Sequence, residues 1–355
     1  MLASVAVAAA FAVDFRLAIT KKTILKGELE DLITFGLLKE MTCDSNGNIF
    51  SPSNRKYSSA INAIVRFPFD ASSYTEFSID SLKDLTNGTI TDFDLEPNGE
   101  LFVLARQVLK FSDVEVPMEF GDSFVVHYDK NGQVLSQLRL RLDSHDFSPT
   151  GIAVMKGGEY LVVGYHQADG KTFVGAEIFQ SGGNLKTRVD LSRGGTKSSK
   201  RGTVASLRVV HPAAIKANGL VYVLRGTTTE PVYVLSESGK PINIIQLKPT
   251  DVEFDSPMIQ GKELIIHEHR AQAEEESGFK IHVGPQWAYA TVFNLESGEI
   301  ADHYYWNNIT ASLACRTSRS FILIGQDQST PDFKWTIFEE EPVGAGKPMG
   351  TVAAY

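Results

Sequence analysis

The sequence predicts an all-β fold built from a repeated four-stranded unit. Short apolar runs alternate with turns that contain glycine, which is the pattern of β-hairpins. One unit reads FSPTGIAVMKGGEYLVVGYH (147–166) followed by KTFVGAEIFQSGGNLKTRVDL (171–191). Few segments longer than ten residues show the 3.6-residue period of a helix, and only short pieces near residues 26–38 are ambiguous.

The unit recurs about six times, with a period of roughly 40–60 residues. Each copy is predicted to contain two strand–turn–strand halves. In chain order the halves are 37–53 and 60–79, 90–107 and 123–140, 147–166 and 171–191, 207–226 and 230–247, 252–270 and 287–306, and 312–328 and 333–340. Residues 15–29 precede the first copy, and we expect them to supply the outer strand of the last unit.

Repeated four-stranded units without intervening helices predict a six-bladed β-propeller of four-stranded antiparallel blades. A ring of such sheets protects its strand edges. A β-sandwich would not need a strand–turn–strand pattern that repeats at this period. Seven blades remain an alternative, because residues 1–36 or the insertion 268–288 could contain another sheet.

Two stretches carry a family resemblance: Pro149–Val154 with Gly158–Val163, and Pro97–Val103. A proline, an apolar strand, a glycine turn and a second apolar strand resemble the NHL-type and TolB-like six-bladed propellers. The resemblance covers nearly the whole chain. It implies that ligands are held on the face that carries the loops between the second and third strands. The chain departs from NHL repeats where an Asp often ends the second strand, since Arg106, Tyr165 and Arg225 stand there.

Polar side chains at the ends of the second strands, together with His211 near the start of a first strand, are the candidate site residues. The propeller arrangement would bring them together around one mouth of the central channel. Histidine, arginine and aspartate suit a small anionic ligand or a divalent metal. The candidates for ligand binding are Arg106, His166, His211, Arg225, His267, His269 and Asp327.

His267 and His269 are also a candidate metal-binding pair. Residues i and i+2 of a strand share a face, so both imidazoles could ligate one ion, with His166 or His211 as a third ligand. A plain polar strand end is the alternative. Six-bladed zinc lyases that act on peptidyl-hydroxyglycine use histidines from several blades, and this resemblance suggests a metal-assisted lyase or hydrolase as the alternative function.

Composition excludes some partners and leaves the compartment open. The net charge of −9 and the pI near 5.5 oppose binding to nucleic acid. No apolar run reaches the roughly 18 residues of a transmembrane segment. Residues 1–14 resemble the apolar part of a signal peptide, so we expect a secreted or periplasmic protein, with a cytoplasmic one as the alternative. Residues 15–355 then form a single propeller domain.

The chain contains two cysteines, Cys43 and Cys315. Both fall in the first strands of units that become neighbours when the ring closes. A disulfide between them is therefore predicted as one alternative, and two free thiols as the other.

Two loops and several aromatic residues favour recognition over catalysis. The loop 192–203 is basic and suits an anion, whereas the insertion 271–287 is acidic and could cover the channel or contact a partner. Trp287 and Tyr304–Trp306 are candidate exposed contacts. The sequence contains no nucleophile elbow, phosphate loop or other compact catalytic motif. The prediction is a non-catalytic propeller that binds a ligand or protein outside the cytoplasm.

Overall fold

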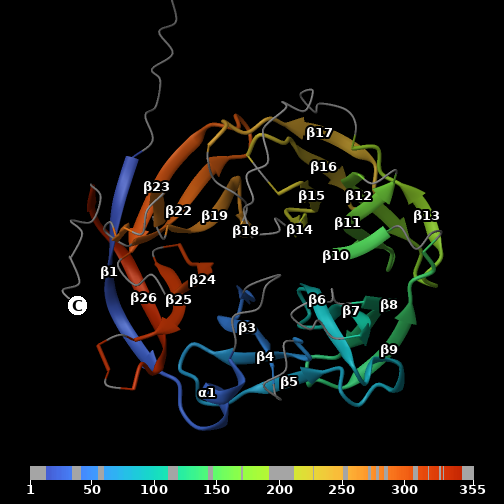
Figure 1. Cartoon of the computed structure of the whole chain (residues 1–355), viewed down its shortest axis with the longest axis horizontal. Coiled ribbons are helices and arrows are strands. Elements are labelled where there is room, and N and C mark those ends of the chain that lie inside the picture. The colour runs from blue at the N-terminus through green and yellow to red at the C-terminus, as the bar shows by residue number, and fades with distance from the viewer. Residues whose placement is uncertain are drawn as a thin grey trace, which may run out of the picture.

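The computed structural model shows an all-β protein whose sheets surround a common centre (Figure 1). The helical elements of the described chain are a short helix, α1 (Glu28–Leu32), and one 3₁₀ turn, η1 (Lys83–Leu85). Neither has the length and apolar character that a membrane crossing requires. The structure describes residues 13–33, 41–54, 60–110, 119–142, 147–168, 171–191, 212–226, 228–250, 255–270, 273–276, 280–283, 287–306, 311–318, 320–327, 329–330 and 332–345.

Four separate four-stranded antiparallel sheets follow one another along the chain, and we call them blades 1 to 4. Blade 1 contains β2 (Thr42–Cys43), β3 (Asn48–Ser53), β4 (Ala63–Pro68) and β5 (Thr75–Ser78). Blade 2 contains β6 (Gly88–Leu95), β7 (Leu101–Lys110), β8 (Glu119–Tyr128) and β9 (Val134–Arg139).

Blades 3 and 4 repeat the same strand order. Blade 3 contains β10 (Phe147–Val154), β11 (Tyr160–Ala168), β12 (Lys171–Phe179) and β13 (Leu185–Arg188). Blade 4 contains β14 (Ala213–Ala217), β15 (Leu220–Leu224), β16 (Val232–Ser236) and β17 (Pro241–Ile245). The first strands β6, β10 and β14 lie nearest the middle of the ring (Figure 1).

The rest of the ring is one continuous eight-stranded sheet, in the order β18-β19-β22-β23-β1-β26-β25-β24. Its strands are β18 (Asp255–Gln260), β19 (Glu263–Arg270), β22 (Trp287–Asn294), β23 (Ile300–Trp306), β1 (Val13–Ile24), β26 (Trp335–Ala345), β25 (Phe321–Gln326) and β24 (Ser312–Arg316). β20 (Ala273–Glu276) and β21 (Lys280–Val283) form a separate two-stranded sheet.

The prediction of six separate blades, or of seven, is therefore wrong: the described chain forms four separate blades and one eight-stranded sheet. The reason is β1. It pairs in antiparallel fashion with β26, as expected of an outer strand, but it also pairs in parallel with β23. This second pairing joins strands that the repeat pattern assigned to two units. Residues 1–12 of the predicted signal-like segment lie outside the described chain, while Val13 and Asp14 begin β1.

Apolar side chains fill the space between each sheet and the next. One cluster joins Phe50 and Phe77 of blade 1 to Phe93 of blade 2, and others join the remaining neighbours around the ring. A further cluster, with Trp306 and Phe338, lies between the two halves of the eight-stranded sheet. Burial of apolar area on both faces of every sheet is the main term that stabilises such a ring.

The turns between third and fourth strands pack against the preceding sheet through glycines. A Cβ at Gly132 (φ +85°) would lie 2.5 Å from the carbonyl oxygen of Glu76 in blade 1. A Cβ at Gly298 (φ +73°) would lie 2.0 Å from that of Gln246, just after β17. Both the positive φ and the close approach require glycine, so these turns fix the spacing of successive sheets.

Inner strands are linked across sheet boundaries. Cys43 in β2 and Cys315 in β24 form a disulfide, with the Cα atoms 5.7 Å apart. Asp92 and Asp94 in β6 accept hydrogen bonds from the backbone N–H groups of Ile152 (2.8 Å) and Val154 (2.7 Å) in β10. The carboxylates of Asp92 and Asp94 thus satisfy backbone N–H groups on the inner edge strand of blade 3, which is a structural role.

Candidate ligand-binding site

One face of the ring carries the loops from second to third strands and from each fourth strand to the next sheet. We call it the connection face. The predicted ligand residues lie on or near it, and their settings differ.

Arg106 is half-buried within blade 2. It pairs with Thr89 in β6 and Ser123 in β8, and its guanidinium lies 4.0 Å from the centroid of the Phe120 ring. Burial lowers the pKa of Arg106 to about 10. The charge is thus held against an aromatic face of its own blade, an arrangement that stabilises a partly desolvated cation.

His166 lies in an aromatic and charged cluster of blade 3. Its ring is 4.6 Å from that of Phe147 and 5.4 Å from that of Phe173, centroid to centroid. Its Nε2 atom is 3.5 Å from the carboxylate of Glu177, which is 1% exposed and also accepts a 2.9 Å hydrogen bond from Arg188. Side chains of the same blade therefore fill the space around His166.

Arg225 follows β15 directly and forms an ion pair with Glu230, with Nη1 and Oε2 3.0 Å apart. The loop that separates them also includes Thr228, whose hydroxyl donates to the carbonyl of Thr250. Arg225 therefore lies within an ordered connection of blade 4. His211 lies outside the described residues.

His267 is buried in β19, opposite Asp255 of β18. Its ring stacks on the indole of Trp306, with centroids 5.0 Å apart. His269 pairs with Ala288 through the backbone, and its side chain lies outside the described part of the structure. Within the described residues, no group of three or more His, Cys, Asp or Glu side chains could hold a metal ion. The setting of His267 favours a role in packing between strands.

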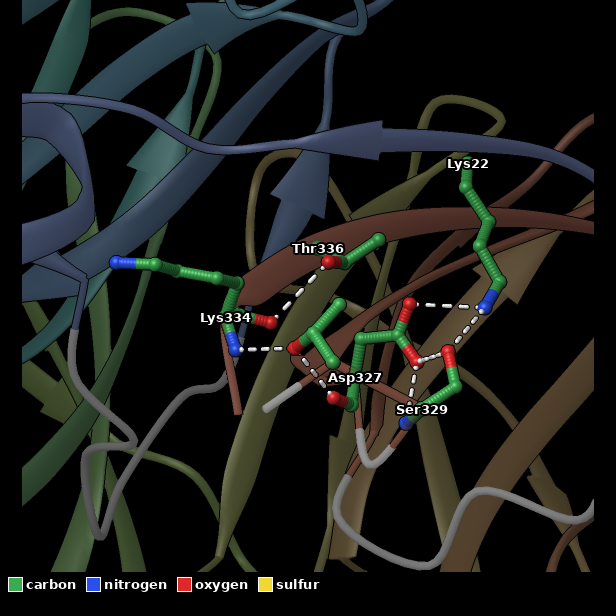
Figure 2. A network of polar contacts seen from close by, with 6 residues as sticks. Lys22, Asp327, Ser329, Lys334 and Thr336 are labelled. Carbon is green, nitrogen blue, oxygen red and sulfur yellow. Dashed lines mark hydrogen bonds and ion pairs between the residues drawn. The ribbon is translucent and has the colours of Figure 1, made fainter. Parts of the chain in front are cut away.

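Asp327 is the centre of a polar network in the loop between β25 and β26 (Figure 2). Its carboxylate accepts hydrogen bonds from Lys22 of β1 (2.8 Å) and from the hydroxyl of Ser329 (2.6 Å). Burial raises the pKa of Asp327, but the hydrogen bonds from Lys22 and Ser329 outweigh it and leave the pKa below its ordinary value. Thr330 donates to the Asp327 carbonyl, which closes the loop. The network fixes β1 to the last strands.

The aromatic contacts expected from the sequence are mostly internal. Tyr304, Tyr305 and Trp306 are buried, so the prediction that they are exposed is wrong. Tyr304 and Trp306 pack in the cluster between the two halves of the eight-stranded sheet. The side chain of Trp287 lies outside the described residues. Among the described side chains, Phe173 and Phe333 have about half of their surface exposed.

Neither of the two charged loops contributes to the described surface. The basic loop 192–203 lies outside the described residues. Within the acidic insertion 271–287, β20 and β21 form a hairpin, and the backbone alone is described. Their predicted roles in binding an anion or a partner stay predictions.

A pocket that the sequence did not indicate opens between blades 1 and 2, on the connection face. Its volume is about 320 Å³. It is bounded by the connection from β5 to β6, the end of β7, the start of β8 and the end of β9. The lining residues are Asp84, Gln107, Asp122, Phe124, Gln137 and Arg139.

Hydrogen bonds hold the polar side chains of this pocket in place. Gln107 donates to the carbonyl of Asp84 (2.8 Å) and accepts from the backbone N–H of Asp122 (3.1 Å). Arg139 donates to the Asp122 carboxylate (2.7 Å), and Gln137 lies 3.4 Å from the Asp84 carboxylate. The network spans four separate segments, so the positions of the groups are set before any ligand arrives.

The network uses only part of the hydrogen-bonding capacity of these groups. Among the described residues, one carboxylate oxygen of Asp84, one of Asp122 and the carbonyl oxygen of Gln137 have no hydrogen-bond partner. The Nε and Nη1 groups of Arg139 are likewise unused. The residues that line the pocket therefore include both acceptors and donors that are not used within the network.

Gln107 of this pocket directly follows Arg106, which the sequence predicted as a site residue. Arg106 was chosen because it lies near the end of the second strand. Adjacent residues of a strand face opposite sides, so its neighbour Gln107 faces blade 1 and the pocket, while Arg106 does not. Gln107 pairs with Gly88, the first residue of β6, so it also lies at the connection face of the blade.

Comparison with known proteins supports the fold and leaves the activity open. No family model matches the chain, and no curated protein matches it. The structure is similar to that of a protein of unknown function from Dyadobacter fermentans, with a TM-score of 0.53 and 8% identity over 92% of this chain and 99% of that one.

A phage phi92 endosialidase gives a TM-score of 0.49 and 10% identity over 94% of this chain and 70% of that one, which is too low to carry an argument. The arrangement of sheets is propeller-like. The NHL-type or TolB-like assignment remains a resemblance.

Proposed function

We propose that this protein is a non-catalytic binding module that recognises a small polar ligand on the connection face. The observation that carries the proposal is the pocket between blades 1 and 2, with side chains fixed by hydrogen bonds and with unused donors and acceptors. A pocket of about 320 Å³ is at the lower end of the roughly 300–1,000 Å³ typical of small-molecule sites.

The chemistry of the pocket favours binding over a metal-assisted reaction. Carboxylates, carboxamides and a guanidinium line it, and no histidine or cysteine is among its lining residues. Asp122 is paired with Arg139 and Asp84 with Gln137, which suits orientation of a ligand more than proton transfer. The alternative, a metal-assisted lyase or hydrolase, has less support because His267 is packed against Trp306.

The disulfide between Cys43 and Cys315 supports a location outside the cytoplasm. Disulfides persist in oxidising compartments and are rare in cytosolic proteins. The apolar residues 1–14 agree with export. We therefore propose that the ligand is met in the periplasm or outside the cell.

The test is a panel of small ligands added to the intact purified protein. Saturation-transfer NMR and thermal shifts would be measured with neutral sugars, sugar acids, amines and amino acids. We expect one class to bind, and Arg139→Ala to weaken its binding. Lys186→Ala is the matched control, because Lys186 forms an exposed ion pair with Glu159 (2.7 Å) on the outer strand of blade 3. Absence of binding by every class would overturn the proposed function.

A further inference from the structure

The pocket carries charges of both signs, and these limit the class of ligand that fits. Asp84 and Asp122 contribute two carboxylates and Arg139 one guanidinium, so the formal charge of the lining is −1. An anionic ligand would meet the unused oxygens of both carboxylates. A cationic ligand would meet the unused N–H groups of Arg139.

A hydroxyl group matches this lining better than either ion. It donates one hydrogen bond and accepts others, so it can contact a carboxylate oxygen and a guanidinium N–H at once. The unused groups of Asp84, Asp122 and Arg139 supply these two roles among the lining residues of one pocket. Hydrogen bonds to charged groups are also stronger than those between neutral groups.

From this juxtaposition we infer that the pocket binds a neutral, polyhydroxylated ring of about monosaccharide size. The inference rests on the proposed binding function and names its ligand class. The volume of about 320 Å³ accommodates one such ring. Phe124 also lines the pocket but is 5% exposed, so polar groups supply most of the contacts. The small anionic ligand predicted for the connection face does not suit this lining.

Gly121 is a positioning residue for this site. A Cβ there would lie 2.8 Å from the Oε1 atom of Gln107 and 3.2 Å from its Cβ. Gln107 connects Asp84 to the backbone of Asp122, so the space left by Gly121 allows the amide to join the two acidic walls. Leu109 Cδ2 is also 3.1 Å away, but the nearest atom is the mobile end of a side chain, so we expect Gly121→Ala to displace Gln107 with a small loss of stability.

The experiment measures the dissociation constants of glucose, galactose, mannose and N-acetylglucosamine by saturation-transfer NMR. Glucuronate and N-acetylneuraminate represent sugar acids, glucosamine represents amines, and alanine and glutamate represent amino acids. We expect at least one neutral sugar to bind, with an affinity on the order of millimolar for so small a ligand. Asp122→Asn and Gly121→Ala should each weaken binding at least tenfold, whereas Lys186→Ala should leave it unchanged.

The thermal midpoint separates a positioning role from a structural one. Gly121→Ala should lose binding while its unfolding temperature stays close to that of the wild type. Preferential binding of a sugar acid, an amine or an amino acid through the same residues would overturn the sugar inference and leave the proposed function standing. Binding of neutral sugars that Asp122→Asn and Gly121→Ala do not weaken would overturn the assignment to this pocket. Absence of any binding would overturn both proposals.

Discussion

Blades 2 and 3 place different side chains at equivalent register positions. Gln107 pairs with the first residue of β6, and His166 pairs with the first residue of β10. By the same register, Phe124 of β8 corresponds to Gly175 of β12. Gln137 of β9 likewise corresponds to Arg188 of β13, because their partners Val126 and Glu177 occupy equivalent places.

The two sets of side chains have opposite consequences. In blade 3 the imidazole of His166 occupies the space that Gly175 leaves open, and Glu177 and Arg188 pair beside it. In blade 2 the amide of Gln107 and the ring of Phe124 occupy the equivalent places, and a pocket remains. The difference teaches that one backbone framework supports dense packing in blade 3 and leaves room for the proposed ligand pocket in blade 2. Substitutions in the two blades should therefore affect different measurements.

The largest effect on stability is expected from Gly175→Ala. The new Cβ would lie 2.2 Å from Cδ2 of His166 and 2.6 Å from its Nε2, so the ring must leave its place between Phe147 and Phe173. We expect a loss of about 1 to 3 kcal/mol in the free energy of unfolding, measured by urea titration. Gly182→Ala in the next turn is the control, since its Cβ meets nothing closer than 3.7 Å. Equal losses in both variants would contradict the close packing of His166.

Glu177→Gln should cost less, about 1 kcal/mol. The substitution keeps the size of a side chain that is 1% exposed but removes the charge shared with Arg188 and His166. Arg188 is 55% exposed, which limits the loss through solvent screening. Denaturant midpoints of Glu177→Gln and of Glu159→Gln, whose carboxylate pairs with Lys186 nearer the surface, should be compared. The comparison between blades fails if Glu159→Gln proves the more damaging variant.

Phe173→Ala should have a smaller effect still, about 0.5 to 1 kcal/mol. The Phe173 ring stacks on His166 but is 48% exposed, so it contributes part of an aromatic pair's energy. Leu135→Ala is the control, because Leu135 is 52% exposed on β9 and belongs to no described ring contact. If Leu135→Ala lowers the unfolding temperature more than Phe173→Ala does, Phe173 does not stabilise the cluster around His166.

Arg139→Ala should change stability least, by about 0.5 kcal/mol or less. Its side chain is 64% exposed, and exposed ion pairs such as that with Asp122 contribute little to folding. Ligand binding should nevertheless be lost, since Arg139 supplies the donors of the pocket. A loss of stability as large as that of Gly175→Ala would show that the polar residues of blade 2 stabilise the fold, as those of blade 3 do.

The strands were predictable because their signals are local. Glycine turns such as Lys130-Asn131-Gly132 and Ser181-Gly182-Gly183 stand between alternating runs, and the structure has hairpins at both places. The fusion of the last eight strands was not predictable in the same way. The parallel pairing of β1 with β23 joins residues that are far apart in the sequence, and no turn marks it. The pattern of apolar residues on β1 does not show whether the strand pairs along one edge or along both.

The candidate site was harder to predict because it depends on which side each strand residue faces. A register difference of one residue exchanges the two faces of a strand, and this separates Gln107 from Arg106. Asp84 comes from a connection and Arg139 from the end of an outer strand, places that no repeat pattern marks as functional. The metal pair proposed from His267 and His269 stays a prediction. The spacing of the two residues suits a chelate, but depth within the sheet decides the neighbours of His267.

The pairing of β1 also sets an order of events during synthesis. Residues 13–24 leave the ribosome long before their partners, which lie in residues 302–305 and 336–345. Such distant contacts form slowly because the chain between them must be ordered first. Until then β1 is an unpaired strand that a second nascent chain could capture. Arg16, Lys21 and Lys22 give it three positive charges, and charges within an apolar strand oppose that misassembly.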